Sequence, residues 1–265
     1  MPSAPAAAAA TAPTELVQGL RAGLAVFSRR SDDVLRVLYA RTVRREVADL
    51  VRWAASREVP CAEAQPAELD RLAQSMSEEG GHHEGLALVT RPRRWAAPKD
   101  LAEALVRERA AAVAIDRVRN PYNIGAVLRS AAFFGLQGAL FGSQTAPQGA
   151  AQGGPGLASA AVRVAEGGVE HLTLARTTDL ADTLGRMRQL GVRVVGADGH
   201  ATTPAASFRF TLPAVLVLGH EREGLGDRVR AQCDSVIAIA GTGRVESLNV
   251  AVAAGVLMAM MAKGR

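Results

Sequence analysis

Gly243-Arg-Val-Glu-Ser247-Leu-Asn249-Val-Ala-Val-Ala-Ala-Gly255 is the most informative stretch of this chain. From Leu248 to Ala262 every residue except Asn249 is apolar or glycine. A helix that is apolar on all faces is normally buried, and this run is short for a membrane span. An amide buried without a partner costs about 1–3 kcal/mol. We therefore expect a polar network or a ligand to meet Asn249, close to Ser247.

Upstream of this stretch, from residue 110 onward, short apolar runs alternate with segments of helical periodicity. This alternation predicts an α/β domain, built on a parallel sheet with helices on both faces. We expect strands over residues 111–118, 138–141, 171–175, 191–197, 214–218 and 236–240. We expect helices over residues 124–134, 179–190 and 247–263.

The earlier part of the chain reads as a second, smaller α/β unit. Apolar residues of the segment 34–56 fall on one stripe at helical spacing, which predicts a helix there. A further helix is expected over residues 66–76, a short strand over 85–90 and a connecting helix over 99–109. We divide the chain into a disordered Ala/Pro-rich tail, a small α/β unit, a linker helix and a larger domain: residues 1–14, 15–95, 96–109 and 110–265.

Composition narrows the class of protein only modestly. The formal net charge of +5 is mild and does not by itself require a nucleic-acid partner. Cys61 and Cys233 are far apart, which favours a reducing compartment, with no disulfide framework and no zinc site. The adjacent His82 and His83 do not converge easily on one ion, so we expect no metal. The tail lacks the features of a signal peptide, and we expect a cytoplasmic protein without a membrane span.

Three polar islands interrupt the apolar pattern of the larger domain. The first, residues 116–135, lies at a strand-to-helix turn. It contains Asn123, a candidate helix cap, and Arg129, which lies off the buried stripe of its helix. Taken alone, this segment is explained by a helix that Asn123 caps and that carries Arg129 as a solvated surface residue.

The second island is Gly219-His-Glu221-Arg-Glu-Gly224, directly after the apolar run 214–218. Ligands of parallel α/β sheets bind on loops that follow the carboxyl ends of strands. An ordinary turn with exposed charges is the alternative. The third island is the pair Ser247 and Asn249, where Ser247 could serve only as a helix cap.

In order and spacing, the three islands together resemble the motifs of the SpoU (TrmH-like) family of RNA ribose 2′-O-methyltransferases, within the SPOUT class. Asn123-Ile-Gly125, with Arg129 after it, is similar to the first motif. The segments 219–224 and 243–250 are similar to the second and third motifs. The resemblance covers residues 110–265 and includes Ala165-Glu-Gly-Gly168 between the motifs.

The resemblance implies a mostly parallel sheet with a C-terminal trefoil knot, an exception to the usual unknotted chain. It implies S-adenosylmethionine as cofactor, RNA as substrate and a homodimer with the active site at its interface. The cofactor-binding positions carried over from the family are Leu218, Gly219, Ile239, Gly241 and Leu248. More loosely, the segment 82–87 resembles the end of an L30e-like substrate-binding domain.

The same resemblance implies catalytic roles for Asn123, Arg129, Glu221, Ser247 and Asn249. An arginine guanidinium stays protonated in proteins, so a base role for Arg129 is disfavoured. We expect Arg129 to bind the target phosphate and to stabilise the developing alkoxide. The other four side chains would orient the arginine, the hydroxyl and the methionine part of the cofactor.

One departure from the family pattern bears on activity. Family members usually carry Ile-Pro-Met where this chain has Ile239-Ala240-Gly241, a change that could soften cofactor binding. The alternative function is therefore a catalytically silent RNA-binding or assembly protein that keeps the fold. A dinucleotide-dependent enzyme is disfavoured because no Gly-x-Gly-x-x-Gly follows the first strand. The choice between rRNA and tRNA stays open at this point.

Overall fold

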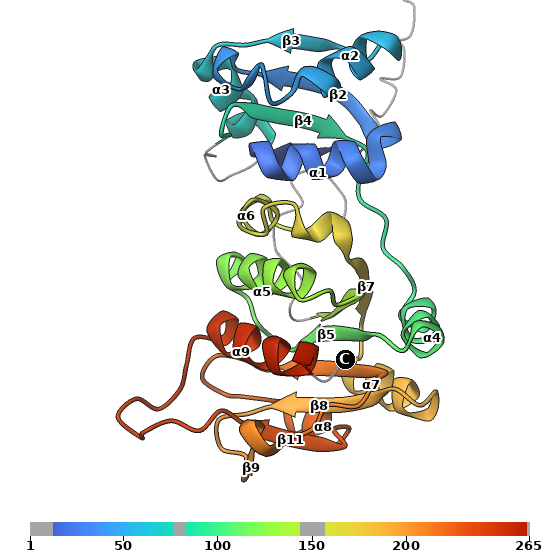
Figure 1. The fold of residues 1–265 in the computed structure, drawn as a ribbon, viewed down its shortest axis with the longest axis vertical. Helices are drawn as coiled ribbons and strands as arrows, with labels where there is room; N and C mark the ends of the chain where they lie inside the picture. Colours follow the sequence, from blue (N-terminus) through green and yellow to red (C-terminus); the bar gives the residue numbers. More distant parts are fainter. Residues whose placement is uncertain (1–12, 77–82, 144–156, 264–265) are drawn as a thin grey trace, which may run out of the picture.

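The structure is a computed structural model that describes residues 13–76, 83–143 and 157–263. Two β-sheets follow each other along the long axis of the molecule (Figure 1). The first belongs to the N-terminal unit, residues 15–90, and the second to the larger domain, residues 111–263. Residues 1–12 of the expected tail, and His82, lie outside the described residues.

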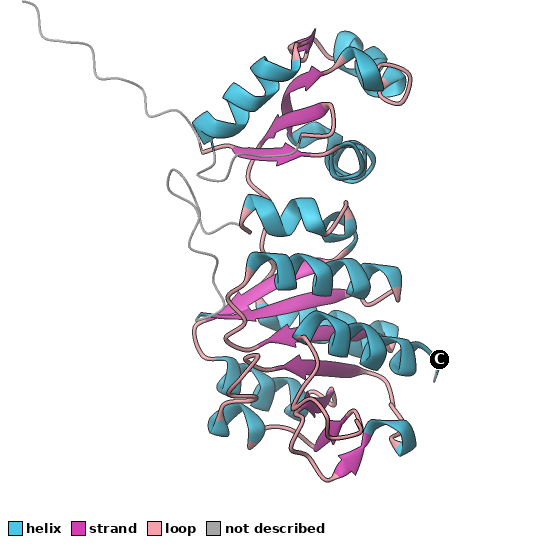
Figure 2. Ribbon diagram, turned by 90° about the vertical axis from the view of Figure 1, so that its left-hand side faces the viewer, coloured by secondary structure: helices cyan, strands magenta, loops and turns pink. Residues whose placement is uncertain are grey.

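The N-terminal unit is a four-stranded sheet flanked by three helices (Figures 1 and 2). Its elements are β1 (Glu15–Gln18), α1 (Leu20–Arg30), β2 (Val34–Tyr39), α2 (Ala48–Ser56), β3 (Cys61–Glu63), α3 (Pro66–Met76) and β4 (Leu86–Thr90). The strand order is β1-β4-β2-β3, and β4 runs antiparallel to both of its neighbours. The expected helix at 66–76 is confirmed as α3, and the expected strand at 85–90 as β4.

The expected helix over residues 34–56 is wrong in its first half. Residues Val34–Tyr39 form the central strand β2, a short 3₁₀ turn follows at Arg41–Val43, and only Ala48–Ser56 is α-helical. Val37 faces the core shared with α1, whereas Leu38 faces the core formed with α3. A strand buried on both faces is a continuous apolar run, which periodicity cannot distinguish from a helix.

The larger domain contains a seven-stranded sheet. Its elements are α4 (Pro98–Glu108), β5 (Ala111–Ile115), α5 (Pro121–Phe133), β6 (Gly138–Gly142), α6 (Ser159–Val164), β7 (Thr173–Thr177), α7 (Leu180–Gln189), β8 (Arg193–Ala197), β9 (Thr203–Pro204), β10 (Ala214–Leu218), α8 (Asp227–Arg230), β11 (Ser235–Ala238) and α9 (Val250–Lys263). The order is β7-β6-β5-β10-β8-β11-β9, and each pair of neighbours is parallel. The expected α/β class with a mostly parallel sheet is confirmed, while the trefoil knot stays a prediction.

Helices cover both faces of this sheet because successive strand residues point to opposite sides. In β5, Val113 and Ile115 pack into the core formed with α5, α6 and α9. Ala112 and Ala114 pack into the core formed with α4, α7 and α8. Gly125 lets α5 and α6 approach closely, since a Cβ there would lie 2.6 Å from the carbonyl oxygen of Ala161.

Helix α9 departs from the expectation of burial on every side. It begins at Val250 rather than at Ser247, and it packs against α5 through one face. Val250, Ala254, Leu257, Met258 and Met261 are buried. Val252 on the same helix is 54% exposed. Across the described ranges, no helix combines the length and apolar character needed to cross a membrane.

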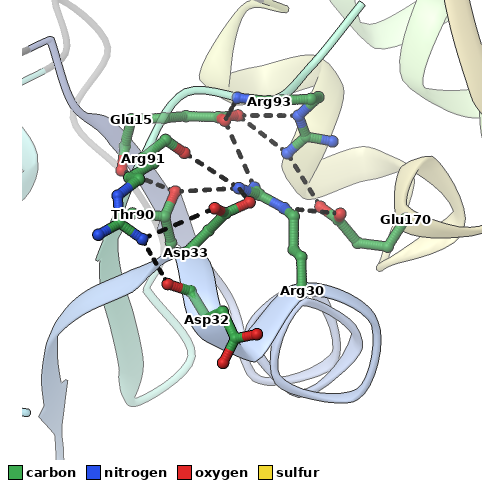
Figure 3. Close-up of polar contacts among 8 residues, drawn as sticks. All are labelled: Glu15, Arg30, Asp32, Asp33, Thr90, Arg91, Arg93 and Glu170. Atoms are coloured by element: carbon green, nitrogen blue, oxygen red, sulfur yellow. Dashed lines mark hydrogen bonds and ion pairs between the residues drawn. The ribbon is translucent and has the colours of Figure 1, made fainter.

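A buried ionic cluster joins the two parts of the chain (Figure 3). Glu170, in the 3₁₀ turn Gly168–His171, pairs with Arg93 at 3.0 Å and with Arg30 of α1 at 2.9 Å. Arg93 also pairs with Glu15 of β1 at 2.8 Å. The Arg93 and Glu170 side chains are only 7% and 6% exposed. The N-terminal unit is therefore fixed against the larger domain by paired, desolvated charges.

The order of the strands explains where a ligand can bind. From β5 the chain builds the sheet in one direction through β6 and β7, whereas β10 lies on the other side of β5. This reversal falls between β5 and β10, and the carboxyl ends of strands at such a point are the usual ligand position in open α/β sheets. The loops after β5, β10 and β11 all leave from this edge, because the three strands are parallel.

Candidate active site

Asn123 lies in the first turn of α5, just after the loop that follows β5. Asn120 is the cap of this helix, with its Oδ1 accepting a hydrogen bond from the backbone N of Tyr122 at 2.9 Å, and Pro121 occupies the first turn. The interpretation that Asn123 is merely a cap is therefore wrong. Its side-chain amide is available for contacts with other loops.

Asn123 connects all three sequence motifs. Its Nδ2 donates to Oε1 of Glu221 at 2.8 Å, and its Oδ1 accepts from Nδ2 of Asn249 at 3.0 Å. We call this chain of hydrogen bonds, Asn249–Asn123–Glu221, the amide relay. The amide relay confirms that a polar partner meets Asn249, although Asn249 is exposed and the expected burial of its amide is wrong. The relay also places the three motifs at one point on the carboxyl edge of the sheet.

The orientation of each amide in the relay follows from its surroundings. Oδ1 of Asn249 accepts from the backbone N of Ala251 at 2.8 Å, so Asn249 caps α9. Its Nδ2 is then the group left to face Asn123, which must accept through Oδ1 and donate through Nδ2 to the carboxylate. The relay thus has one direction and ends on Glu221.

Glu221 lies at the tip of a tight hairpin after β10. The backbone groups of His220 and Gly224 bond to each other in both directions at 3.0 Å. Gly219 precedes this hairpin, and a Cβ there would lie 2.4 Å from the carbonyl carbon of Gly224. Position 219 therefore admits only glycine, and Gly224 has a φ of +65°, which also favours glycine.

A second set of contacts, not assigned from the sequence, holds the loops after β5 and β10 together. The Asp116 side chain is buried and accepts from the backbone N of Gly226 at 3.1 Å. Arg117 donates to Oε2 of Glu223 at 2.6 Å and to the carbonyl of Gly224 at 3.0 Å. The sequence feature that could have indicated these contacts is the carboxylate of Asp116, directly after the apolar strand β5. These residues support the position of Glu221.

Arg129 lies further along α5 and is not engaged by the amide relay. Its Nη1 donates to Oε1 of Glu166 at 2.7 Å, and its side chain is 51% exposed. Six residues separate it from Asn123, which in an α-helix gives a rise of about 9 Å and a different facing direction. The structure therefore brings Asn123, Glu221 and Asn249 together and leaves Arg129 on a neighbouring surface.

The remaining candidates lie on the β10 end and on the loop from Ile239 to Asn249. This loop projects from the carboxyl edge of the sheet (Figure 1). Leu218 is buried and Ile239 half-buried, whereas Gly241, Ser247 and Leu248 are exposed. A Cβ at Gly241 would meet no atom within 4 Å. Within residues 13–76, 83–143 and 157–263, no group of His, Cys, Asp or Glu side chains is arranged to hold a metal ion.

The chain is similar to known proteins of one family. Residues 110–259 match the SpoU rRNA Methylase family. An uncharacterized tRNA/rRNA methyltransferase of Mycolicibacterium gilvum is 33% identical over 252 residues, covering 94% of this chain and 74% of the relative.

Two solved structures share the architecture. The SpoU methyltransferase AviRb of Streptomyces viridochromogenes, in complex with AdoMet, has a TM-score of 0.74 at 25% identity, covering 94% of this chain and 90% of that one. An AdoMet-bound rRNA methyltransferase of Sinorhizobium meliloti has a TM-score of 0.74 at 20% identity, covering 94% and 87%, a likeness of fold. The family match spans the three motifs that the amide relay connects, and the chain belongs to the SpoU family of RNA methyltransferases.

Proposed function

We propose that this protein transfers a methyl group from S-adenosylmethionine to a ribose 2′-hydroxyl of rRNA or tRNA. The observation that carries the proposal is the amide relay, because it gathers one residue from each family motif at the carboxyl edge of the sheet. Membership of the SpoU family supports RNA methylation, and the similar AviRb structure contains AdoMet. The choice of the ribose oxygen rests on the resemblance of the motifs.

The residues at this edge of the sheet suit a nucleoside cofactor. Gly219 brings the backbone after β10 to the edge of the sheet, and Gly241 leaves open space beside the loop after β11. Ile239 and Leu248 offer apolar surface for a purine ring, next to backbone amides and carbonyls. Leu218, Gly219, Ile239, Gly241 and Leu248 would hold the cofactor.

The reaction needs alignment and charge stabilisation more than a strong base. Bound S-adenosylmethionine would supply a methyl group on a sulfonium. In-line attack of the 2′-oxygen on the methyl carbon would break the carbon–sulfur bond and release the neutral thioether, and the hydroxyl proton would pass to solvent. In this scheme the amide relay of Asn123, Glu221 and Asn249 holds polar side chains in fixed positions beside the path of the methyl group. Ser247, exposed just before α9, places a hydroxyl at the same edge. Arg129 binds the phosphate next to the target ribose and stabilises the negative charge that develops on the ribose 2′-oxygen.

A homodimer belongs to the same proposal. Helix α9 is apolar up to its last residue, Lys263, yet Val252 is more than half exposed, and Phe133 at the end of α5 is 82% exposed. Because α5 and α9 pack against each other, both exposed side chains lie on one helical layer. A second copy of the chain would cover such apolar surface.

The N-terminal unit is proposed as an L30e-like RNA-binding domain, with residues 15–95, 96–109 and 110–265 as binding domain, linker helix and catalytic domain. The two free cysteines, Cys61 and Cys233, fit a reducing location such as the cytoplasm, where rRNA and tRNA are modified. No metal takes part in this scheme.

The test is transfer of labelled methyl from S-adenosylmethionine to RNA from cells that lack ribose methylation, with rRNA and tRNA fractions assayed separately. We expect label in one fraction, resistance of the labelled linkage to alkali because its 2′-hydroxyl is blocked, and loss of label with Arg129→Ala. Labelled bases instead of riboses would contradict the ribose assignment. Cofactor binding without label in either fraction would favour the catalytically silent RNA-binding protein.

A further inference from the structure

Glu166 lies between two arginines that come from different parts of the chain. Its Oε2 accepts from Nη1 of Arg21 on α1, in the N-terminal unit, at 2.6 Å. Its Oε1 accepts from Nη1 of Arg129 on α5, in the larger domain, at 2.7 Å. One carboxylate therefore bridges the proposed catalytic arginine and an arginine 145 positions from Glu166.

The backbone holds Glu166 at this position. Glu166 itself has a φ of +45°, a left-handed conformation that non-glycine residues adopt rarely and at a cost. The following residue, Gly167, packs so closely on α1 that a Cβ would lie 2.7 Å from Cβ of Ala25. A Cβ on Gly168 would lie 3.2 Å from Cα of Arg129. The turn is thus wedged between α1 and α5, and it carries a carboxylate to their junction.

The bridge is accessible to a ligand. The side chains of Arg21 and Arg129 are 71% and 51% exposed, and that of Glu166 is 30% exposed. Exposed ion pairs are weak and screened by salt, so an incoming anion can replace the carboxylate. Guanidinium groups bind phosphate and carboxylate oxygens with the same forked geometry. Two such groups 2.6 and 2.7 Å from one carboxylate are therefore already spaced for a phosphodiester.

We propose that Arg21 and Arg129 form a single RNA phosphate-binding site across the two parts of the chain, which Glu166 occupies when RNA is absent. The proposal rests on the proposed function for its ligand, a phosphodiester of the RNA substrate. Entry of that phosphate displaces the carboxylate and transfers Arg129 from Glu166 to the substrate. A phosphate that binds in this way contacts Arg21 on α1 and Arg129 on α5 at the same time.

RNA affinity as a function of salt tests this site. The probe is a fluorescein-labelled single-stranded RNA of mixed sequence, followed by anisotropy from 50 to 300 mM KCl. Glu166→Gln removes the competing charge and keeps the side-chain shape. We expect its Kd to fall about 3- to 10-fold at 50 mM KCl, with the difference shrinking at high salt. Arg21→Ala should raise Kd and lower the slope of log Kd against log salt by about 0.7, the loss of one phosphate contact.

Matched controls separate this site from a general effect of charge. Asp182 and Arg186 form an exposed ion pair on α7, on the opposite face of the sheet from α5. Asp182→Asn changes net charge as Glu166→Gln does, and Arg186→Ala matches Arg21→Ala. We expect both control variants to leave Kd within about twofold of wild type. Equal effects of the site variants and their controls would overturn the proposal.

A catalytic readout distinguishes the site from the function on which it rests. With the unmethylated form of the RNA fraction that wild type labels as substrate, Arg21→Ala should raise KM with little change in kcat, whereas Arg129→Ala should lower kcat. Methyl transfer by wild type, together with unchanged RNA affinity of Glu166→Gln and Arg21→Ala, would refute the site alone. Altered affinities without any methyl transfer would retain the site and refute the methyltransferase. A wild type that binds no RNA would refute both.

Discussion

Asn249 donates a hydrogen bond of 3.0 Å to Asn123, a residue 126 positions earlier in the chain. Because Asn249 also caps α9, and Asn123 continues to Glu221, this single bond ties the start of α5, the start of α9 and the hairpin after β10 to one geometry. The two hydrogen bonds of the amide relay form together only while all three segments keep their places.

Removing the central amide should impair methyl transfer more than stability. Asn123→Ala leaves Nδ2 of Asn249 and Oε1 of Glu221 without their relay partner. We expect methyl transfer to fall about 10- to 100-fold because the Glu221 and Asn249 side chains are then misplaced. Asn120→Ala is the control, because it removes a cap on the same helix and should cost about 1 kcal/mol of unfolding free energy. Initial rates and urea unfolding measure the two effects. Equal rate losses in both variants would contradict a specific role for Asn123.

We expect glycine at position 219 to be required for binding of S-adenosylmethionine. In Gly219→Ala the new methyl group would overlap the carbonyl of Gly224, so the hairpin must move. We expect at least a tenfold loss of S-adenosylmethionine affinity by calorimetry, with about 1–3 kcal/mol of destabilisation from overpacking. Gly199→Ala serves as the control, since its Cβ would meet no atom within 4 Å. Wild-type affinity in Gly219→Ala would place the cofactor elsewhere.

The buried ionic cluster should contribute strongly to stability. Glu170→Gln leaves the guanidinium groups of Arg93 and Arg30 facing a neutral amide in a desolvated position. Breaking a buried pair from one side costs about 3–5 kcal/mol. The exposed pair of Asp182 and Arg186 supplies the contrast, because Asp182→Asn should cost less than about 1 kcal/mol. Urea unfolding of both variants checks the ranking, and similar costs would argue against burial as the cause.

Cys233 should react slowly with alkylating reagents at neutral pH. Burial raises the pKa of its thiol to about 11, above the unfolded value of 9. The thiolate fraction at pH 8 is then about one thousandth, and the reaction with iodoacetamide should quicken about tenfold per pH unit up to pH 11. A raised folded-state pKa also means that the associated stability is complete below pH 9 and is lost as the pH rises through 11.

The Cys61→Ser variant leaves Cys233 as the one thiol, so its labelling rate can be followed by mass spectrometry. Urea-unfolded protein provides the reference rate. A native rate that levels off near pH 9 would show that the thiol is not desolvated.

The parts of the fold that could be predicted from the sequence are those with unambiguous periodicity. The strand 214–218 is a short apolar run between two turn-rich segments, a pattern that favours a strand, and its predicted bounds are the observed ones. The segment 34–56 failed because Val37 and Leu38 are buried on opposite faces, which removes the alternation typical of a half-buried strand.

The candidate site divides in the same way. Asn123, Glu221 and Asn249 were predicted together because each belongs to a short motif with recognisable spacing, and the amide relay joins them. The ion pair of Arg129 with Glu166, and the link from Glu166 to Arg21, had no local signal. Such contacts depend on how α1 docks on the larger domain, and pairing between distant surface charges leaves no periodic trace in a sequence.

The ionic cluster around Glu170 and Arg93 has a geometric consequence for any substrate that contacts both parts of the chain. With Arg30 and Glu15 also bound into the cluster, the N-terminal unit has little freedom to rotate about its junction (Figure 3). The distance from the sheet of the N-terminal unit to the amide relay is then constant. For an RNA bound to both parts of the chain as proposed, this fixed distance would select which nucleotide reaches the amide relay.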